Sequence, residues 1–444
     1  MKFFTKCFAA GFIWSVILAV LVQKLVLPVF LPEMHEGNGL LAGRDSALFH
    51  ELAKAHAVEI RELGWSHWQI SPYSEDWNPN AYENMEPAGM LAVLYVFLPS
   101  QPWVLIPVNA FFHGAAFALL VGIFRFVSEN AKQAVFAALP FLVFPSALTW
   151  YAQIHRDGMF IFGVFSVLLG LLFLLRSNEC PLAPLSKWLG GFTLLLLGFL
   201  CLEFSRGYAI PIIILAMIPA SLILLLDQLL AKRAFAVGLA VLVMAILGGG
   251  VFALANTTSE SIQKDRFAEE VVPEERAEHQ AGVWSGFGNL VQQQVEGINE
   301  ARERFVGFHP DAGTLIDEDV RYSNLSDLLR YAPRAIWIGV LAPFPNAWGS
   351  PGDGIERFVA SGEMLCAYLF FIGIPFLFLN SRKVGPVTSL IIAALVPILV
   401  FSLATPVVGA LYRFRYGFWQ ILLGLGILGW CALSARIERR RRKG

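Results

Sequence analysis

The sequence predicts an all-α polytopic membrane protein, and three observations carry that prediction. Apolar runs of about twenty residues, each long enough to cross the hydrocarbon core of a bilayer, recur along most of the chain. Of the 444 residues, 56% are hydrophobic and only 15% are charged, whereas a soluble domain is about a quarter charged. Lysine and arginine gather in alternate connections between the apolar runs. We therefore expect one membrane domain with polar loops rather than several soluble domains.

Length and hydropathy predict about ten transmembrane helices. The first follows Lys2 and Lys6 in the manner of a signal peptide, but it is long and lacks a small-residue cleavage site, so we expect a retained anchor. The expected spans are 8–31, 102–127, 134–151, 158–175, 188–204, 208–227, 235–255, 361–380, 385–403 and 413–434.

The positions of basic residues predict the orientation of these spans. An even number of spans puts both termini on one side, together with every second connection. Those connections carry Lys2, Lys6, Arg125, Lys132, Arg176, Lys187, Lys232, Arg233, Arg382, Lys383 and the basic tail after Arg436. Because cytoplasmic loops carry an excess of Lys and Arg, we expect both termini in the cytoplasm of a bacterial inner membrane, with the functional face toward the periplasm.

Three parts follow from this topology. An N-terminal transmembrane module is expected over 1–255 and includes the external loop 32–87 as part of a catalytic core. A second external loop is expected over 256–360. A C-terminal transmembrane module with a basic cytoplasmic tail completes the chain over 361–444.

The external loops are expected to carry short helices. The apolar stretches Ala88–Leu98 and Ala335–Pro345 are too short to span a bilayer, which favours re-entrant or interfacial helices. The stretch Ser46–Leu63 has apolar residues at helical spacing and predicts a helix on the membrane surface. The polar region from Asn256 to Arg334 has too few apolar residues for a core of its own.

Charge and motif content narrow the possible functions. The net charge is −1, so no global basic field exists and nucleic acid is not an expected partner. Walker, GxGxxG, HExxH and GxSxG motifs do not occur, which argues against nucleotides, nicotinamides and zinc hydrolysis. No metal site is indicated and the cofactor stays open, with a divalent ion compatible. A donor for external chemistry would then arrive already activated, most simply on a polyprenyl phosphate carrier.

Asp45 is the candidate catalytic residue. It lies in the polar segment that follows the first span, beside the expected external surface of the membrane. A sugar transferase needs a base at that depth to accept the proton of an acceptor hydroxyl. The alternative is that Asp45 caps the helix that starts at Ser46, since Asp is a favoured N-cap residue. Capping is the commoner role.

The turn between the third and fourth expected helices holds His155, Arg156 and Asp157. Ionisable residues near lipid are costly unless they meet partners or a ligand. The guanidinium offers a fork of donors suited to phosphate, and a histidine can donate to phosphate or relay a proton. These residues are therefore predicted to bind the substrate phosphate, with a local Arg156 to Asp157 pair as the alternative.

Three further arginines lie at expected outer helix ends. Arg413 and Arg415 could clamp a diphosphate if their segment is extended, whereas in a helix they would point to different faces. The alternative is that they reach toward water at the interface, beside an aromatic belt. For Arg206 the interfacial alternative is favoured, with substrate binding secondary.

Glu83 and Glu86 precede the first short apolar segment. They are possible secondary acidic groups of the site. Acidic residues also suit the positive end of a helix dipole, and that reading is the favoured one for both.

The order of these segments resembles the GT-C class of integral-membrane glycosyltransferases, which includes protein O-mannosyltransferases and the aminoarabinose transferase of lipid A. The resemblance covers roughly the first 175 residues. It rests on one outward helix, then Gly43–Phe49, then Glu86–Phe97 leading into Pro107–Asn109, and then Pro145–Tyr151 before His155–Asp157.

Later segments carry a weaker likeness, to polysaccharide-cluster transferases and polymerases. It rests on Tyr331–Pro333, Leu341–Pro345 and Tyr412–Arg415. Many members of the class have a Ser-Glu pair at the third turn, whereas this chain has Arg156-Asp157, as in some capsule polymerases.

The resemblance implies inverting transfer of a sugar from a polyprenyl-phosphate-linked donor to an external glycan, lipid or protein acceptor in envelope polysaccharide assembly. It assigns the acceptor-activating acid to Asp45 alone. A repeat-unit polymerase or ligase is the nearest alternative, in which the arginines dominate and Asp45 is structural. A lipid or sugar transporter or flippase comes third, because transporters place ionisable groups near the bilayer midplane and here they gather at outer helix ends.

Overall fold

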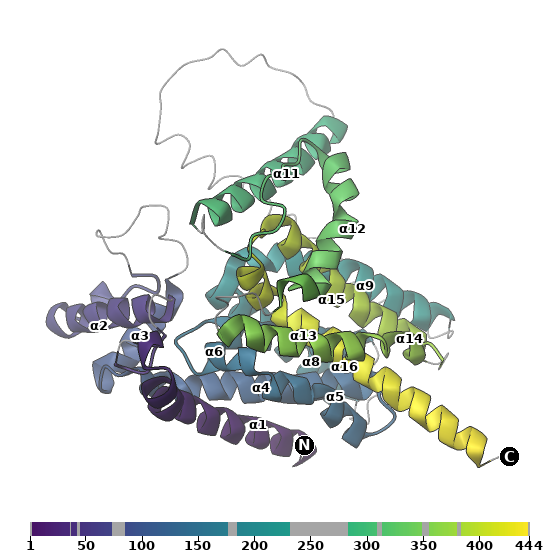
Figure 1. The fold of residues 1–444 in the computed structure, drawn as a ribbon, viewed down its shortest axis with the longest axis horizontal. Coiled ribbons are helices and arrows are strands. Elements are labelled where there is room, and N and C mark those ends of the chain that lie inside the picture. Colours follow the sequence, from purple (N-terminus) through teal and green to yellow (C-terminus); the bar gives the residue numbers. More distant parts are fainter. Residues whose placement is uncertain are drawn as a thin grey trace. The chain divides into compact units, whose positions relative to one another are not determined.

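The computed structural model describes residues 2–35, 37–41, 45–72, 85–175, 184–230, 283–308, 313–348, 355–379 and 383–442. Within these ranges the chain is mostly helical, and its β pairing consists of two isolated bridges, His35 with Leu41 and Leu315 with Val407 (Figure 1). The all-α class predicted from the sequence is confirmed.

The helices have the following bounds. In the first half they are α1 Lys2–Leu21 with its π-helical continuation Val22–Phe30, α2 Asp45–Leu63, α3 Glu86–Phe97, α4 Ile106–Val127, α5 Ala131–Val143, α6 Leu148–Tyr151, α7 Asp157–Leu175, α8 Pro184–Arg206 and α9 Ile210–Leu230. In the second half they are α11 Val283–Phe308, α12 Leu325–Leu341, α13 Ile355–Phe371, α14 Ile374–Leu377, α15 Val384–Ala404 and α16 Val408–Arg441. Short 3-10 turns are Pro32–Met34, Trp65–His67, Pro102–Leu105, Pro145–Ala147, Gly207–Ala209 and Pro345–Ala347.

Seven helical stretches in the described ranges are long and apolar enough to cross a membrane. They are Lys2–Phe30, Pro102–Val127, Asp157–Leu175, Trp188–Leu230, Arg357–Leu377, Val384–Ala404 and Val408–Arg441. The longest includes most of α8 and all of α9, and the backbone leaves helical geometry between these two helices at Arg206, where φ is −154° and ψ is 69°. The expected count of ten is not reached in this part of the chain, and the expected span 235–255 lies outside the described residues.

The expected span 134–151 is not one helix. The helix α5 ends at Val143 after 13 residues, and a separate 3-10 turn and the four-residue α6 follow it. Proline disfavours helical geometry in the residue before it, and Phe144, which precedes Pro145, has φ −67° and ψ 123°. After this break, the 3-10 turn and α6 lead the chain into the turn at His155.

The described residues form two compact units. The first comprises Met1–Ile210, Gly349–Val387 and Gln420–Gly444, and the second comprises Pro211–Trp348 and Thr388–Trp419. Glycines let the helices of the first unit pack backbone to backbone. A Cβ on Gly163 would lie 3.0 Å from the carbonyl oxygen of Gly198, so α7 and α8 meet there directly. Small residues at such contacts are how membrane helices gain van der Waals packing.

The amphipathic segment predicted near residue 46 is helix α2, and its apolar face is covered by protein. Phe49, Ala53 and Ile60 pack with Leu91 and Tyr95 of α3 in one buried cluster. The two helices lie side by side in Figure 1. Most of the surface that would have faced lipid therefore faces α3, and the expected position on the membrane surface stays a prediction.

In the second unit, α11 and α12 share a small core with the end of α15. Val295, Tyr322 and Ala335 form one buried cluster with Leu403. The sequence of the polar loop lacks enough apolar residues for a core of its own, and the structure shows that a membrane helix supplies one of them. Arg302 is 1% exposed and donates to the carbonyl oxygens of Asp317, Val320 and Leu403, which ties α11 to this core.

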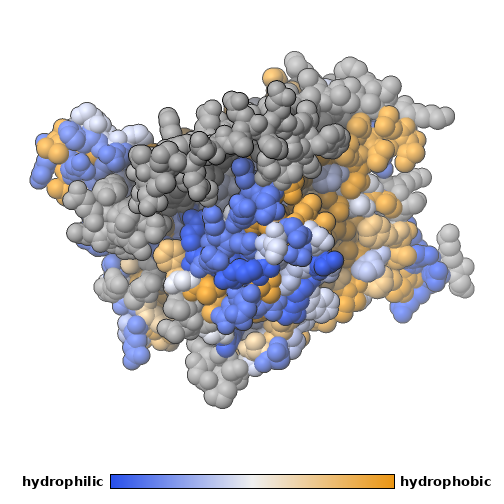
Figure 2. Space-filling view, turned by 90° about the horizontal axis from the view of Figure 1, so that it is seen from above, coloured by the Kyte–Doolittle hydropathy of each residue, from blue (hydrophilic) through white to orange (hydrophobic). Residues whose placement is uncertain are grey.

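The surface agrees with a chain that meets both lipid and water. On the face drawn in Figure 2, hydrophobic and hydrophilic side chains gather in separate areas. Along α8, large exposed hydrophobic side chains follow helical spacing at Leu189, Phe192, Leu196 and Leu200. An exposed leucine face of this length is costly in water and ordinary in a bilayer.

Candidate functional site

The candidate site is the turn between α6 and α7, in the first compact unit. The chain leaves α6 at Tyr151 and re-enters a helix at Asp157. Side chains from other helices satisfy the carbonyl groups in between: Gln23 donates to Ala152 at 2.7 Å, and Asn109 donates to Gln153 at 2.6 Å. The turn is thus held from two membrane helices, which a loop on the surface would not need.

The start of the segment is anchored as well. The carboxylate of Glu363, on α13, accepts a hydrogen bond from the backbone N–H of Ser146 at 2.7 Å. Glu363 is 4% exposed. Its negative charge meets the positive end of the short helical segment, where anions are stabilised. This anchor fixes the entry into α6.

Arg206 and Asp157 form a buried ion pair. The distance from Arg206 Nη2 to Asp157 Oδ1 is 2.5 Å, and the side chains are 1% and 2% exposed. The guanidinium also lies over the ring of Phe160, 5.0 Å from its centroid. The prediction that Arg206 reaches water at the interface is therefore wrong. A carboxylate on α7 draws the end of α8 inward, and the pair positions the turn.

His155 and Arg156 lie beside this pair and are less deeply buried than it. His155 Nδ1 is 3.9 Å from Asp157 Oδ2, and the His155 side chain is 8% exposed. Arg156 is 16% exposed and its Nη1 lies 3.7 Å from Oε2 of Glu86, at the start of α3. The structure pairs the Asp157 carboxylate with Arg206 and places the Arg156 guanidinium beside Glu86, and the alternative of a local Arg156 to Asp157 pair stays a prediction.

Glu86 is a carboxylate with raised proton affinity. Burial raises its pKa above the ordinary value, its own backbone N–H and the charge of Arg156 lower it, and the charge of Glu203 raises it again, so the net shift is upward. Glu86 is the first residue of α3, as the helix-start reading predicts, and its side chain is 21% exposed and faces Arg156. Glu83 lies outside the described residues.

Gln153 joins the turn to the segment that carries Asp45. Its Oε1 accepts from the backbone N–H of Leu41 at 2.8 Å and from Ser46 Oγ at 3.4 Å, and its Nε2 donates to the carbonyl of Gly39 at 3.2 Å. Gln153 is 1% exposed. Asp45 is the exposed first residue of α2, next to Ser46. The structure therefore brings the predicted base and the predicted phosphate-binding turn into one region.

Arg413 and Arg415 belong to the second compact unit and do not form a common clamp. The segment is helical from Val408 onward, so the extended geometry that a shared clamp requires is absent and the two side chains point to different faces. Arg413 is partly buried. Arg415 is fully buried and donates to the carbonyls of Gly339 at 2.6 Å and Ala342 at 2.5 Å.

The surroundings of Arg415 assign it a structural role. Its guanidinium lies 4.6 Å from the ring centroid of Tyr412 and 5.1 Å from that of Trp419. The carbonyls that it binds belong to the last turn of α12, whose end carries partial negative charge. Arg415 is therefore a cap for α12. The prediction that it reaches water at the interface is wrong, because none of its side chain is exposed.

Sequence reasoning missed four polar residues that position the site, and one signal could have found them. Gln23, Asn109, Gln153 and Glu363 are buried polar residues within or beside apolar runs. Buried polar groups in a membrane protein need partners, so each predicts a specific contact. The partner itself is a backbone atom of a distant segment, which no sequence pattern reveals.

Fold and composition together define the class of protein, an all-α, multi-pass membrane protein. Comparison of the chain with protein-family models, with curated proteins and with solved structures finds no match. Among the described residues, no group of three or more His, Cys, Asp and Glu side chains could hold a metal ion.

Proposed function

We propose that the protein transfers a sugar from a polyprenyl-phosphate-linked donor to an extracytoplasmic glycan, lipid or protein acceptor. The observation that carries the proposal is the hydrogen bonding of Gln153, which links the segment next to Asp45 to the turn that holds Arg156. An exposed carboxylate and a partly exposed guanidinium then occupy one region at the end of apolar helices. A lipid-linked phosphosugar needs both groups there.

The chemistry assigns one role to each group. Asp45 accepts the proton of the acceptor hydroxyl as that oxygen forms a bond to the anomeric carbon. The bond from the anomeric carbon to the phosphate oxygen breaks, and the polyprenyl phosphate leaves with that electron pair. Arg156 stabilises the charge on the leaving phosphate, with His155 as a further donor. Asp157 and Arg206 hold the turn that presents them.

The resemblance to GT-C glycosyltransferases is part of the proposal. It includes about ten membrane helices in a bacterial inner membrane, cytoplasmic termini and a site that faces the periplasm. Separate helices α8 and α9, the short α5 followed by α6, and a span at 235–255 would bring the seven observed stretches to ten. Basic residues in alternate connections support the orientation.

The test is Asp45→Asn in the full chain. Lipid-linked sugars extracted from the producing cells serve as donor, and release of polyprenyl phosphate is measured together with product length. We expect a loss of about 10²–10⁴-fold with unchanged protein abundance, because an amide keeps the size of the side chain but cannot take the proton. Glu51→Gln is the matched control, since Glu51 is an exposed acid on the same helix. Normal transfer by the Asn variant would return Asp45 to helix capping.

Product length separates the nearest alternative. A repeat-unit polymerase would give a ladder of products with the same donor, and a single-sugar transferase gives one product. If the wild-type chain releases no polyprenyl phosphate from any lipid-linked fraction, and the two variants release none either, the result would contradict glycosyl transfer.

A further inference from the structure

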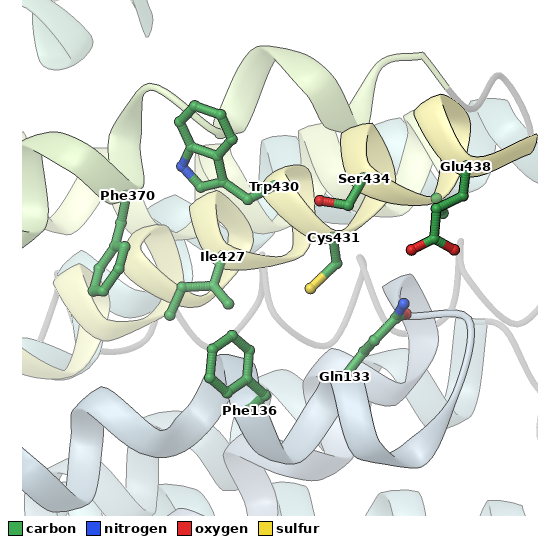
Figure 3. A pocket seen from close by; sticks show the side chains of 9 residues that line it. Gln133, Phe136, Phe370, Ile427, Trp430, Cys431, Ser434 and Glu438 are labelled. Carbon is green, nitrogen blue, oxygen red and sulfur yellow. The ribbon is translucent and has the colours of Figure 1, made fainter. Parts of the chain in front are cut away.

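A groove in the first compact unit lies away from the candidate site. It has a volume of about 470 Å³ and is lined by α5, α13 and α16. Figure 3 shows Ile427, Cys431 and Glu438 pointing from α16 toward α5, and Phe136 pointing from α5 toward α16. Trp430 donates from its indole N–H to the carbonyl of Leu369 at 2.9 Å, which fixes the wall formed by α13.

The lining changes from apolar to polar along one face of α16. Ile427, Trp430, Cys431, Ser434, Ala435 and Glu438 all line the groove and recur at helical spacing. The eleven-residue step from Ile427 to Glu438 corresponds to about 16 Å along the helix axis. An occupant that satisfies both ends is an amphiphile with its apolar part beside Ile427 and its polar part beside Glu438.

Positive charge continues the same face beyond the polar end. Arg441 and Arg442 follow Glu438 by three and four residues, the spacing that puts side chains on one helix face, and both are exposed. Neighbouring Arg439 pairs with Glu129 at 3.2 Å. Two arginines against one carboxylate leave a positive balance where the polar part of the amphiphile would lie.

We propose that this groove binds an anionic phospholipid of the leaflet in which α16 ends. One acyl chain lies along Phe136, Phe370 and Ile427, and the phosphate lies beside Arg441 and Arg442. The apolar end of the groove matches the acyl-chain region of one leaflet, and the basic end matches its headgroup region. Anionic headgroups attract basic side chains that flank a membrane helix. A second protein copy would have to bury Glu438 and the arginine side chains, at a cost that a mobile lipid headgroup avoids.

The test is native mass spectrometry of the full chain in detergent with added phosphatidylglycerol or phosphatidylcholine. We expect tighter binding of phosphatidylglycerol. Ala435→Phe fills the groove and should abolish that preference, whereas Ile437→Phe, on an exposed face of the same helix turn, should leave it unchanged. Arg441→Gln with Arg442→Gln should weaken phosphatidylglycerol about tenfold or more and leave phosphatidylcholine unaffected. Glu438→Gln should strengthen phosphatidylglycerol binding.

Three results would overturn the proposal. The first is equal affinity for the two lipids in the wild-type chain, and the second is an unchanged preference in the folded Ala435→Phe variant. The third is a dimer that retains no lipid and dissociates on Ala435→Phe, which would assign the groove to a second copy. If Ala435→Phe does not fold, the double arginine variant decides alone, because its changes lie on an exposed helix end.

Discussion

Two arginine and carboxylate pairs, one in each compact unit, use the same chemistry and differ in how the carboxylate is held. Asp317 accepts hydrogen bonds from the Tyr331 hydroxyl at 2.6 Å and from Arg334 Nε at 3.1 Å. Glu86 has the guanidinium of Arg156 at 3.7 Å, beyond hydrogen-bonding distance. Hydrogen bonds join Asp317 to Arg334, whereas Glu86 and Arg156 form an ion pair at a longer distance.

The pKa shifts of the two carboxyls have opposite directions. Burial would raise the pKa of Asp317, but hydrogen bonds from Arg334 and Tyr331 and the nearby positive charges lower it below its ordinary value. Burial raises the pKa of Glu86, and Arg156 is too distant to reverse the shift. The difference teaches that Asp317 and Arg334 form a structural pair, whereas the longer contact between Arg156 and Glu86 is the one that the proposed function would exchange for a contact with the donor phosphate.

The largest effect on stability is expected for the fully buried ion pair of Arg206 and Asp157. Arg206→Met removes the guanidinium from a carboxylate that is 2% exposed, so we expect a loss of about 3–5 kcal/mol in the free energy of unfolding. Adding Asp157→Asn should recover part of the loss, because the buried charge is then removed. Denaturant unfolding in detergent measures both. A loss below about 1 kcal/mol, typical of surface pairs, would contradict the buried geometry.

A smaller effect is expected for Asp317→Asn, with a defined pH dependence. Asn can adopt the left-handed backbone of Asp317, where φ is 53°, so the variant tests the charge rather than the turn. The folded-state pKa is lowered, so the charge stabilises the fold fully above the ordinary value of 3.8 and less as pH falls through the lower folded value. We expect a loss of about 1–2 kcal/mol at neutral pH. Melting temperatures of variant and wild type should converge at acid pH.

Convergence is the feature that distinguishes this account. A constant difference between the two melting curves at every pH would show that the Asp317 charge contributes nothing and that the variant acts through packing.

The smallest effect on stability is expected for Glu86→Gln, and its sign is opposite. The folded-state pKa of Glu86 is raised, so its contribution to stability is fully present below the ordinary value of 4.5 and is lost as pH rises through the folded value. The Gln variant should therefore be at least as stable as wild type at neutral pH and lack that pH dependence. It should also bind polyprenyl phosphate somewhat more tightly, because Arg156 loses a competing anion. Weaker binding of polyprenyl phosphate by the Glu86→Gln variant would contradict the proposal that Arg156 exchanges Glu86 for the phosphate.

The sequence predicts the helical class, most span positions, the helix that begins near residue 46, and the polar turn at His155. These depend on hydropathy and local spacing, which the chain carries in each segment. It does not predict that Arg206 and Arg415 are buried, because both belong to motifs typical of helix ends at the membrane interface. Which partner neutralises each arginine depends on a segment far along the chain: Asp157 for one and the end of α12 for the other. The role of Gln153 is hidden for the same reason.

Two matched substitutions, Arg156→Lys and Arg334→Lys, test most directly whether Arg156 binds phosphate while Arg334 has a structural role. Both retain positive charge and lose the planar fork that suits phosphate. Binding of polyprenyl phosphate and the abundance of folded protein are measured together. We expect affinity to fall about tenfold or more for Arg156→Lys with unchanged abundance, and to stay at the wild-type value for Arg334→Lys. Equal affinity in both variants and wild type would contradict a phosphate site at the turn that holds Arg156.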